Sequence, residues 1–220
     1  QATLVGANLA AALLRYASLA GADLLRANLQ AAQLAGATLA GASLREAVLV
    51  TADLSEASLT AALLAGANLR AADLPGADLT DAVLTDSILT DASLRSATLE
   101  RADLADADLA RTDLVAASLV DASLTGARLT GARLAQADFA GAVFGGTTIA
   151  GVDLSVASGL SRSIHASPSE VDDSTLALTL AGGGGSFGPE ALAFLRAAGV
   201  PDDRLAAPLT SPSLRSRVEG

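Results

Sequence analysis

Residues 77–96 read ADLTD AVLTD SILTD ASLRS, four consecutive groups of five residues with an aliphatic residue at the third place of each. This spacing runs without insertion or deletion from position 4 to position 154. All 31 central positions hold Leu except Phe139, Phe144 and Ile149, and Ala stands two residues earlier in 27 of the 31 units. So strict a period identifies an internal repeat, and the repeat decides the fold.

The five-residue period is incompatible with a helix. Five residues rotate a helix by roughly 500°, so successive leucines would lie about 140° apart and would form no apolar face. In extended backbone, the Ala and the Leu of each unit lie two residues apart and point to the same side. The next two residues must then turn the chain, and the second of them is Gly eleven times and Asp five times. Leu74-Pro75-Gly76-Ala77 carries the Pro-Gly pair of a type II turn, so the chain is predicted to coil around an axis with Leu and Ala inside.

The units resemble a known repeat family. Residues 22–26 (ADLLR) and 77–81 (ADLTD) are similar to the A(D/N)LXX motif of the pentapeptide-repeat family, and the resemblance covers residues 2–156. It implies an all-β fold, a right-handed, four-sided (quadrilateral) parallel β-helix with four of the five-residue units in each coil. Nearly eight coils follow, and we assign residues 1–156 to this β-helix domain.

Residues 157–220 lack the period and are predicted to form a small, mostly helical C-terminal cap or linker. A helix is predicted over residues 189–198 with Gly199 as its C-cap, and a second short helix is predicted to begin at residues 201–203. The glycine-rich residues 182–186 are interpreted as a loop, because the Lys that a phosphate-binding loop requires is absent.

The same segment carries a second resemblance. Short stretches between residues 164 and 202 resemble the segment that follows pentapeptide repeats in some bacterial multidomain proteins, often before a Toll/interleukin-receptor-like domain. The resemblance implies that residues 157–220 join the rod to an effector domain. The chain also begins in mid-pattern at Gln1, which favours a piece of a longer protein.

Composition excludes most catalytic chemistry. The chain has no Cys, one His (His165) and no Lys among its 14 basic residues, which removes thiol catalysis, Cys-ligated metals and Schiff-base chemistry. A net charge of −10 opposes binding to nucleic-acid phosphates or an anionic membrane. We therefore expect no enzyme, no cofactor, no metal, no membrane contact and no small-molecule substrate. His165, in a Ser-rich stretch, is interpreted as a structural or solvated residue.

Every position recurs on the same face of such a coil after four units, so the outer surface can be described in columns. Opposite charges alternate in several columns and predict ion pairs that contribute a few tenths of a kcal/mol each. An amide ladder is predicted in another. These columns are Asp81, Arg101 and Asp121; Asp91 and Arg111; Arg26 and Glu46; and, for the amides, Asn8 and Asn28.

Other columns place like charges together, and four acids mark a candidate partner-binding surface. Residues 73–113 hold ten acids against three Arg, and Asp86 stacks with Asp106. Asp103 and Asp108 lie on the same coil as Asp106. Two interpretations stay open: the family's own preference for Asp before Leu, or an acidic belt that binds a basic partner.

Four apolar residues occupy outward positions near two adjoining faces. Leu63 and Val83 are adjacent in one column, while Val48 and Ile88 flank Asn68 in the next. Single exposed apolar residues are normal, but a cluster of four indicates a contact surface for a protein partner or for a second copy in a homodimer.

Two functions are carried forward. The first is a non-catalytic interaction or scaffold module, cytoplasmic and bacterial, within a larger signalling or defence protein. The second is a DNA mimic that binds a type II topoisomerase (gyrase), as the quinolone-resistance branch of the family does. A rod of about 37 Å would replace roughly 20 DNA charges. Residues 1–156 hold 17 acids and 9 Arg, a net charge of −8, which weakens the second hypothesis.

Overall fold

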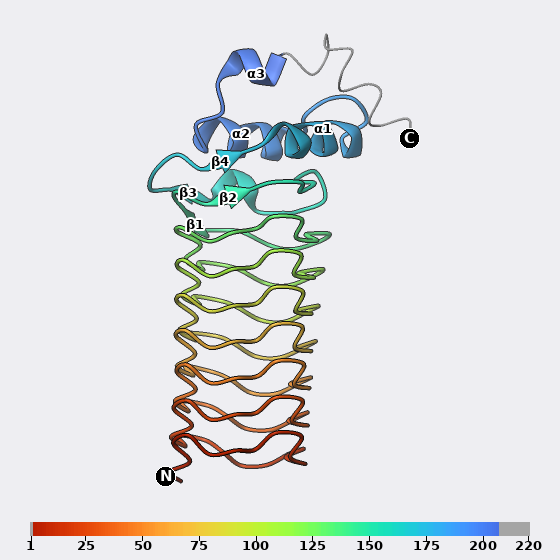
Figure 1. Ribbon diagram of the computed structural model, residues 1–220. Helices are drawn as coiled ribbons and strands as arrows, with labels where there is room; N and C mark the ends of the chain where they lie inside the picture. Colours follow the sequence, from red (N-terminus) through yellow and green to blue (C-terminus); the bar gives the residue numbers. More distant parts are fainter. Residues whose placement is uncertain (1, 207–220) are drawn as a thin grey trace.

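The computed structural model describes residues 2–206 and shows a rod of stacked coils with helices at its C-terminal end (Figure 1). Parallel bridges pair the outward positions with their equivalents four units later, from Thr3 with Asp23 to Asp138 with Ser158, except at position 133. This register confirms the predicted length of the coil, while the count of nearly eight coils stays a prediction. Position 1 and residues 207–220, the end of the predicted C-terminal segment, lie outside the described residues.

The Leu and Ala of each unit fill the interior of the rod. Leu79 and Ala77, for example, are fully buried. Each coil is joined to its neighbours by backbone hydrogen bonds: the Leu79 N–H donates to the Thr98 carbonyl at 2.7 Å, and the Asp78 N–H donates to the Ala57 carbonyl at 3.0 Å. Inward side chains therefore stack at the spacing of paired strands, about 4.8 Å, and leave the described interior packed with side chains.

The corners of the coil are the expected turns. The Ala77 N–H donates to the Leu74 carbonyl at 3.2 Å, and Gly76 has φ 66°, as the second central residue of a type II turn requires. The same position holds a non-glycine residue at positive φ in many other turns, among them Asp86 at φ 57°. This left-handed backbone region favours Gly, so each non-glycine residue there carries a conformational cost.

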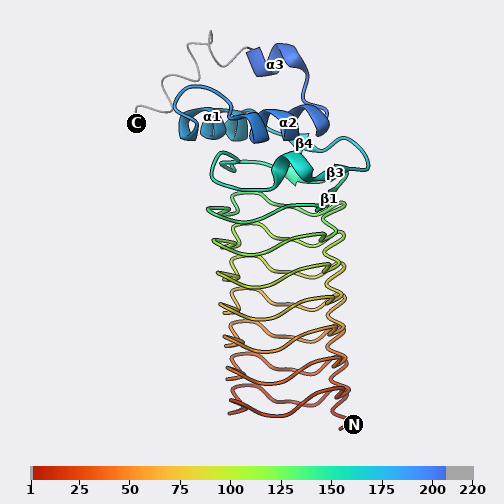
Figure 2. The same cartoon turned by 180° about the vertical axis from the view of Figure 1, so that it is seen from behind.

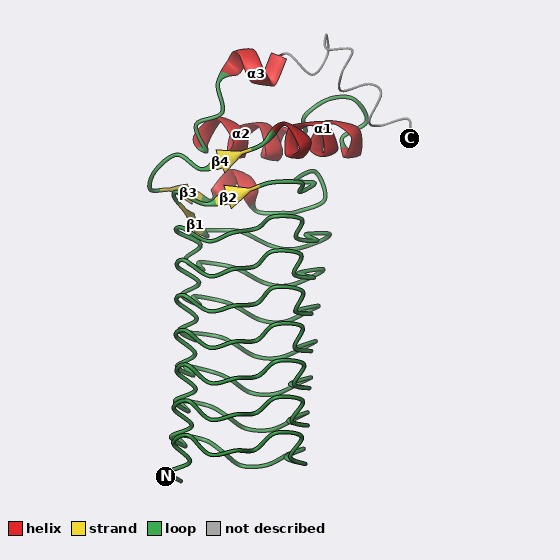
Figure 3. Ribbon diagram, viewed as in Figure 1, coloured by secondary structure: helices red, strands yellow, loops and turns green. Residues whose placement is uncertain are grey.

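Short strands lie between the regular coils and the C-terminal helices, and the register changes there (Figures 2 and 3). Strand β1 (Val143–Phe144) pairs in parallel with β3 (Ile164–His165), at an offset one position longer than in the coils. Strand β2 (Thr148–Ile149) pairs in parallel with β4 (Glu170–Val171), at an offset two positions longer. The 3-10 helix η1 (Leu160–Arg162) lies in the chain that connects them.

Three α-helices follow: α1 (Asp173–Gly182), α2 (Pro189–Ala197) and α3 (Asp202–Ala206). The helix predicted over residues 189–198 is confirmed as α2, and the short helix predicted at residues 201–203 is confirmed as α3. Helix α1 was not predicted. The predicted glycine-rich loop connects α1 to α2, except that Gly182 is the last residue of α1.

Helix α1 lies across the last coil and satisfies part of its open backbone edge. In earlier turns the amide of the fourth residue donates directly to the Leu carbonyl. In the turn at residues 149–152 the Thr175 hydroxyl lies between these groups: it accepts from the Val152 N–H and donates to the Ile149 carbonyl, both at 3.2 Å. One helical turn later, the Thr179 hydroxyl accepts from the Leu154 N–H at 3.0 Å. The two side chains replace the groups of a further coil.

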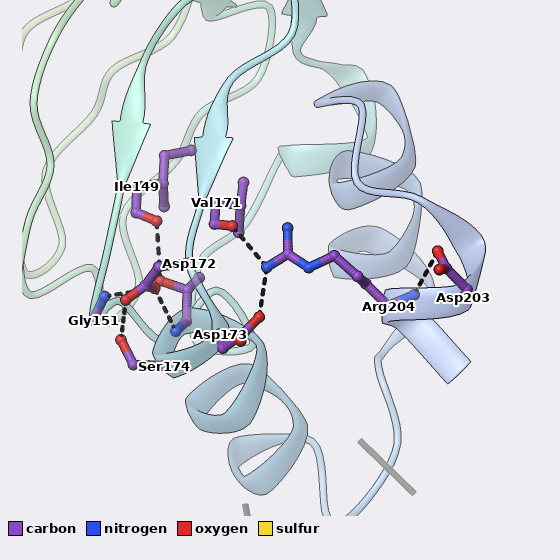
Figure 4. A network of polar contacts seen from close by, with 9 residues as sticks. Ile149, Gly151, Val171, Asp172, Asp173, Ser174, Asp203 and Arg204 are labelled. Atoms are coloured by element: carbon purple, nitrogen blue, oxygen red, sulfur yellow. Dashed lines mark hydrogen bonds and ion pairs between the residues drawn. The ribbon is translucent and has the colours of Figure 1, made fainter. Parts of the chain in front are cut away.

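Charged side chains complete this end of the rod (Figure 4). The Asp172 carboxylate accepts from the Gly151 N–H at 3.1 Å and caps α1 by accepting from the Thr175 N–H at 2.8 Å. The Arg204 guanidinium of α3 donates to the Val171 carbonyl at 3.0 Å and pairs with Asp173 at 2.7 Å. These contacts hold α1 and α3 on the last strand.

Candidate protein-binding surface

The filled interior leaves the outer surface as the place where the rod meets other molecules. Among residues 2–206, no group of three or more His, Cys, Asp or Glu side chains is arranged to hold a metal ion. No helix in this described part of the chain is both long enough and apolar enough to cross a membrane.

Outward side chains at equivalent positions of successive coils form four flat faces. The first face carries positions 3, 23, 43 and so on to 143, and the second carries positions 8 to 148 in the same steps. The third face begins at position 13 and the fourth at position 18. Residues of the intervening turns form the corners between faces.

The eight predicted partner-binding residues lie together on the first and second faces and at the corner that joins them. We call this set the corner surface. Its members are Val48, Leu63, Val83, Asp86, Ile88, Asp103, Asp106 and Asp108. Their proximity is shown by the register, while their role in binding stays a prediction.

The aliphatic half of the corner surface extends over both faces and is interrupted by Asn68. Leu63 pairs with Val83 on the first face, and Val48 and Ile88 each pair with Asn68 on the second. Ile88 is 40% exposed and the other three side chains are partly exposed. The fourth face holds only Ser, Thr and Asp at its outward positions, so outward aliphatic residues are not a general requirement of the coil.

The acidic half follows directly along the rod. Val83 pairs with Asp103 in the next coil, and Ile88 pairs with Asp108. The two carboxylates accept from backbone amides two residues on, Asp103 from Ala105 at 3.1 Å and Asp108 from Ala110 at 3.0 Å. These hydrogen bonds hold each carboxylate against its own turn.

Most of this negative charge is not neutralised by the chain's own cations. Asp86, Asp103 and Asp106 have no ion pair among the described residues, and Asp108 lies 3.5 Å from the Arg128 guanidinium. Asp86 and Asp106 stack in one column. Carboxylates at the coil spacing of about 5 Å repel by about 1 kcal/mol in water. The acidic half is therefore a surface that a cation from another molecule would stabilise.

Columns of alternating charge form the predicted ion pairs. Arg101 donates twice to Asp81, at 2.7 and 2.9 Å, and Arg111 donates twice to Asp91, at 2.7 and 2.8 Å. Hydrogen bonds from the guanidinium lower the pKa of the Asp81 and Asp91 carboxyls. Asp121 is not paired with Arg101, whose guanidinium is directed to Asp81.

Two further predicted contacts are present near the N-terminal end. Arg26 donates to Glu46 at 2.7 Å, and this hydrogen bond lowers the pKa of the Glu46 carboxyl. The Asn28 amide donates to Asn8 at 3.3 Å, which confirms the amide ladder. All these pairs lie on the surface, so they order side chains more than they stabilise the fold.

His165 lies between the rod and the helices. Its ring stacks on Phe144 at 5.6 Å and meets Phe194 of α2 edge-on at 4.7 Å. Its Nε2 lies 3.2 Å from the Ser163 hydroxyl, while the buried Nδ1 has no hydrogen-bond partner. Burial lowers the pKa of the imidazole. Because Asp172 is engaged in capping α1, these residues form no Ser-His-Asp site, and the packing agrees with a structural role.

Sequence analysis missed the residues that finish the rod, Asp172, Thr175 and Thr179. The available signal was the run DDST at residues 172–175, in which an Asp precedes a Thr by three residues as an N-cap does. The polar character of the two Thr concealed it, since they occupy the buried side of α1.

Comparison with known proteins identifies the family. The pentapeptide-repeat profile matches in eight copies, with matched segments spanning residues 1–155. The chain therefore belongs to the pentapeptide-repeat family. None of the curated proteins compared matches it in sequence.

Several solved structures are similar to this chain. QnrB1, described as a plasmid-mediated fluoroquinolone resistance protein, is 20% identical with a TM-score of 0.63, over 76% of this chain and 83% of its own. Pentapeptide-repeat proteins from the cyanobacterium Cyanothece and from the thylakoid lumen of Arabidopsis thaliana are each 29% identical. They cover 46% and 49% of this chain, and 58% and 66% of their own, with TM-scores of 0.28 and 0.20. The likeness to QnrB1 shows a shared right-handed quadrilateral β-helix.

Proposed function

We propose that the chain is a non-catalytic protein-binding rod that acts as an interaction or scaffold module. The observation that carries this proposal is the filled interior: inward Leu and Ala side chains from Ala22 to Leu154 are almost all inaccessible to solvent. Any partner of the regular coils must therefore be recognised by side chains on flat outer faces. Such faces suit a protein surface better than a small molecule, which needs a concave site.

The corner surface is the part of the rod that we assign to a partner, and its chemistry can be tested directly. Immobilised rod is compared with the double variant Asp86→Asn, Asp106→Asn in capture from a bacterial lysate, with retained proteins quantified. The matched control is Asp53→Asn, Asp73→Asn, which removes a like-charged stacked pair from the third face. We expect at least one retained protein to fall about tenfold with the corner variant only. Equal retention by both variants would place binding elsewhere, and no specific retention by any rod would contradict the function.

A more specific proposal concerns the larger protein to which the rod belongs. We propose that it is part of a larger cytoplasmic signalling or defence protein of a bacterium, with residues 157–220 leading to an effector. The helices that complete the last coil support this, because they turn an open solenoid end into a surface on which another domain can rest. Sequencing the native reading frame beyond both ends of the chain tests it. A frame that stops close to residue 220 and starts close to residue 1 would refute it.

A second candidate is a DNA mimic that binds a type II topoisomerase. Its support is the fold shared with QnrB1, at a TM-score of 0.63, and no comparison offers similar support for the larger signalling protein. The charge distribution opposes it. Six of the 17 acids in residues 1–156 pair with Arg, which leaves 11 acids without an ion pair among the described residues. DNA of the same length carries roughly 20 negative charges. The paired acids are Glu46, Asp81, Asp91, Glu100, Asp108 and Asp113.

A supercoiling assay decides the second candidate. A DNA mimic inhibits gyrase at micromolar protein, and raising the salt weakens that inhibition because the contact is electrostatic. If supercoiling proceeds unchanged at such concentrations, the DNA-mimic hypothesis is wrong, while the more general protein-binding function is unaffected.

A further inference from the structure

We propose that the first face binds a second copy of this chain in an antiparallel homodimer, with a two-fold axis that passes between Leu63 and Val83. A 180° rotation about an axis that runs along the strands makes the partner rod point in the opposite direction. Each column of outward residues then faces the same column of the partner. Each residue then faces the residue that lies equally far on the other side of the axis. The arrangement can therefore be tested column by column.

The outward residues of the first face are self-complementary about this axis. At the centre, aliphatic side chains face each other across the interface. On either side, a carboxylate faces a serine hydroxyl that can donate to it. The four pairs, each formed twice, are Leu63 with the partner's Val83, Ser43 with the partner's Asp103, Asp23 with the partner's Ser123, and Thr3 with the partner's Val143.

The corner that precedes this face is complementary in size. In the C-terminal half of the rod, this corner carries the large side chains of Asp81, Arg101 and Asp121. The axis places them opposite small residues of the partner, at positions 61, 41 and 21, which are Ala, Gly and Gly. Two copies can therefore approach without collision along this edge, although Arg101 and Asp81 stay joined in their own ion pair.

The corner that follows the face supplies the missing cation. Arg45 is exposed and has no ion pair among the described residues. The axis places it opposite the partner's Ala105, between the partner's Asp103 and Asp106. Both acids lack a cation in their own chain, so each dimer would gain two such contacts. One like-charged contact opposes them, since Glu46 faces the partner's Asp106, but Glu46 is already held by Arg26 at 2.7 Å.

The other faces do not share this property. The equivalent axis would place Val48 of the second face opposite an Asp at position 108, and Asp53 of the third face opposite an Asp at position 113. The fourth face is compatible in charge but has no aliphatic centre. Of the four described faces, the first combines an apolar centre with complementary flanks.

The size of the face sets the expected strength. A three-residue strand is about 10 Å wide, and coils stacked at about 4.8 Å give a length of roughly 37 Å. The flat area is therefore on the order of 400 Å² for each copy, below the area of standard stable interfaces. We expect a weak dimer in rapid exchange, as for other interfaces at the low end of this size range.

Sedimentation equilibrium tests the apolar centre. We expect the chain to shift from monomer to dimer as its concentration rises, and Leu63→Asp to weaken association at least tenfold. Asp already occupies outward positions of this coil, so the variant should fold. Ser58→Asp adds the same charge to the fourth face and should leave association unchanged. A chain that stays monomeric up to about a millimolar overturns the proposal, and so does a dimer that Leu63→Asp leaves intact.

Disulfide formation tests the register, since the chain has no Cys of its own. Chains with Ser43→Cys are mixed with chains with Asp103→Cys. In the antiparallel dimer the two introduced cysteines lie opposite each other, so the chains should cross-link on oxidation. Ser43→Cys alone should not, because the two copies of position 43 would lie three coils, about 14 Å, apart, beyond disulfide reach. The matched control on the fourth face mixes Ser58→Cys with Ser118→Cys. Cross-linking of Ser43→Cys alone, or of the control as efficiently as the test pair, would refute the antiparallel first-face dimer.

Discussion

The hydroxyl of Thr179 should carry a large share of the stability of the C-terminal end of the rod. It is fully buried and is the only hydrogen-bond partner of the Leu154 amide among the described residues. Replacement by Val keeps the shape of the side chain and removes the acceptor. A buried amide left without a partner costs about 1–3 kcal/mol, so Thr179→Val should lower the free energy of unfolding by that amount.

A matched control lies inside the rod. Thr112 is also fully buried, and its hydroxyl donates to the Leu89 carbonyl at 2.8 Å. That carbonyl also accepts from the Ala92 N–H at 3.0 Å, so Thr112→Val leaves no group unpaired. We expect its cost to be about 1 kcal/mol or less. Both variants make the same chemical change, and the difference between them isolates the unpaired amide.

Two measurements check this prediction. Denaturant unfolding gives the two free-energy changes, and native-state hydrogen exchange reports the opening of the Leu154 amide itself. Because a solenoid opens from its ends, exchange should accelerate near residue 154 in Thr179→Val and stay unchanged there in Thr112→Val. Equal destabilisation by the two variants, with no local change in exchange, would refute the assignment of Thr179 as an edge-satisfying residue.

Three further predictions follow from the fold. Ala77→Leu adds three carbon atoms to a fully buried site and should destabilise the rod by about 1–3 kcal/mol or more, whereas an unchanged melting curve would contradict the inward placement of Ala. Ala116→Gly relieves a non-glycine residue at φ 59° and should raise the free energy of unfolding by up to about 1 kcal/mol, which urea titration measures. Burial lowers the pKa of His165 in the fold, so the unfolded chain binds the proton more readily and stability should fall as the pH drops below about 6.5. The His165→Gln variant should show a flatter dependence of its urea midpoint between pH 7.5 and 5.5, and an equally steep one would contradict this role.

The rod was predictable because one local pattern fixes both the turn and the register. Leu, Ala and the turn residues recur every five positions, so the same short-range geometry is repeated until the chain stacks on itself. Ion pairs such as Arg101 with Asp81 then follow from counting, since the partners occupy equivalent positions of successive coils. The corner surface was also found this way, because columns can be counted without knowing any atomic position.

The end of the rod was not predictable by the same means. Helix α1 buries Thr175 and Thr179 as well as Leu176, so its buried side is not marked by apolar residues. Its polar residues face inward because backbone groups of the last coil need partners, a requirement that exists only once the coil has formed. The pairings of β3 and β4 likewise use sequence offsets longer than one coil, and the repeat pattern does not predict such offsets.

Non-glycine residues at turn positions with positive φ indicate where contact with another molecule has shaped the surface. A non-glycine residue in left-handed backbone costs about 1 kcal/mol relative to Gly, and more than half of the turns hold such a residue. At Arg101 and Arg111 the side chain at this position joins an ion pair with the neighbouring coil, although exposed pairs return little of that cost. Asp86 and Asp106 occupy the same position, repel each other, and have no ion pair among the described residues. A Gly at either place would favour the isolated rod. In the proposed dimer the partner's Arg45 approaches Asp106, whereas Asp86 would be stabilised by a cation from another molecule.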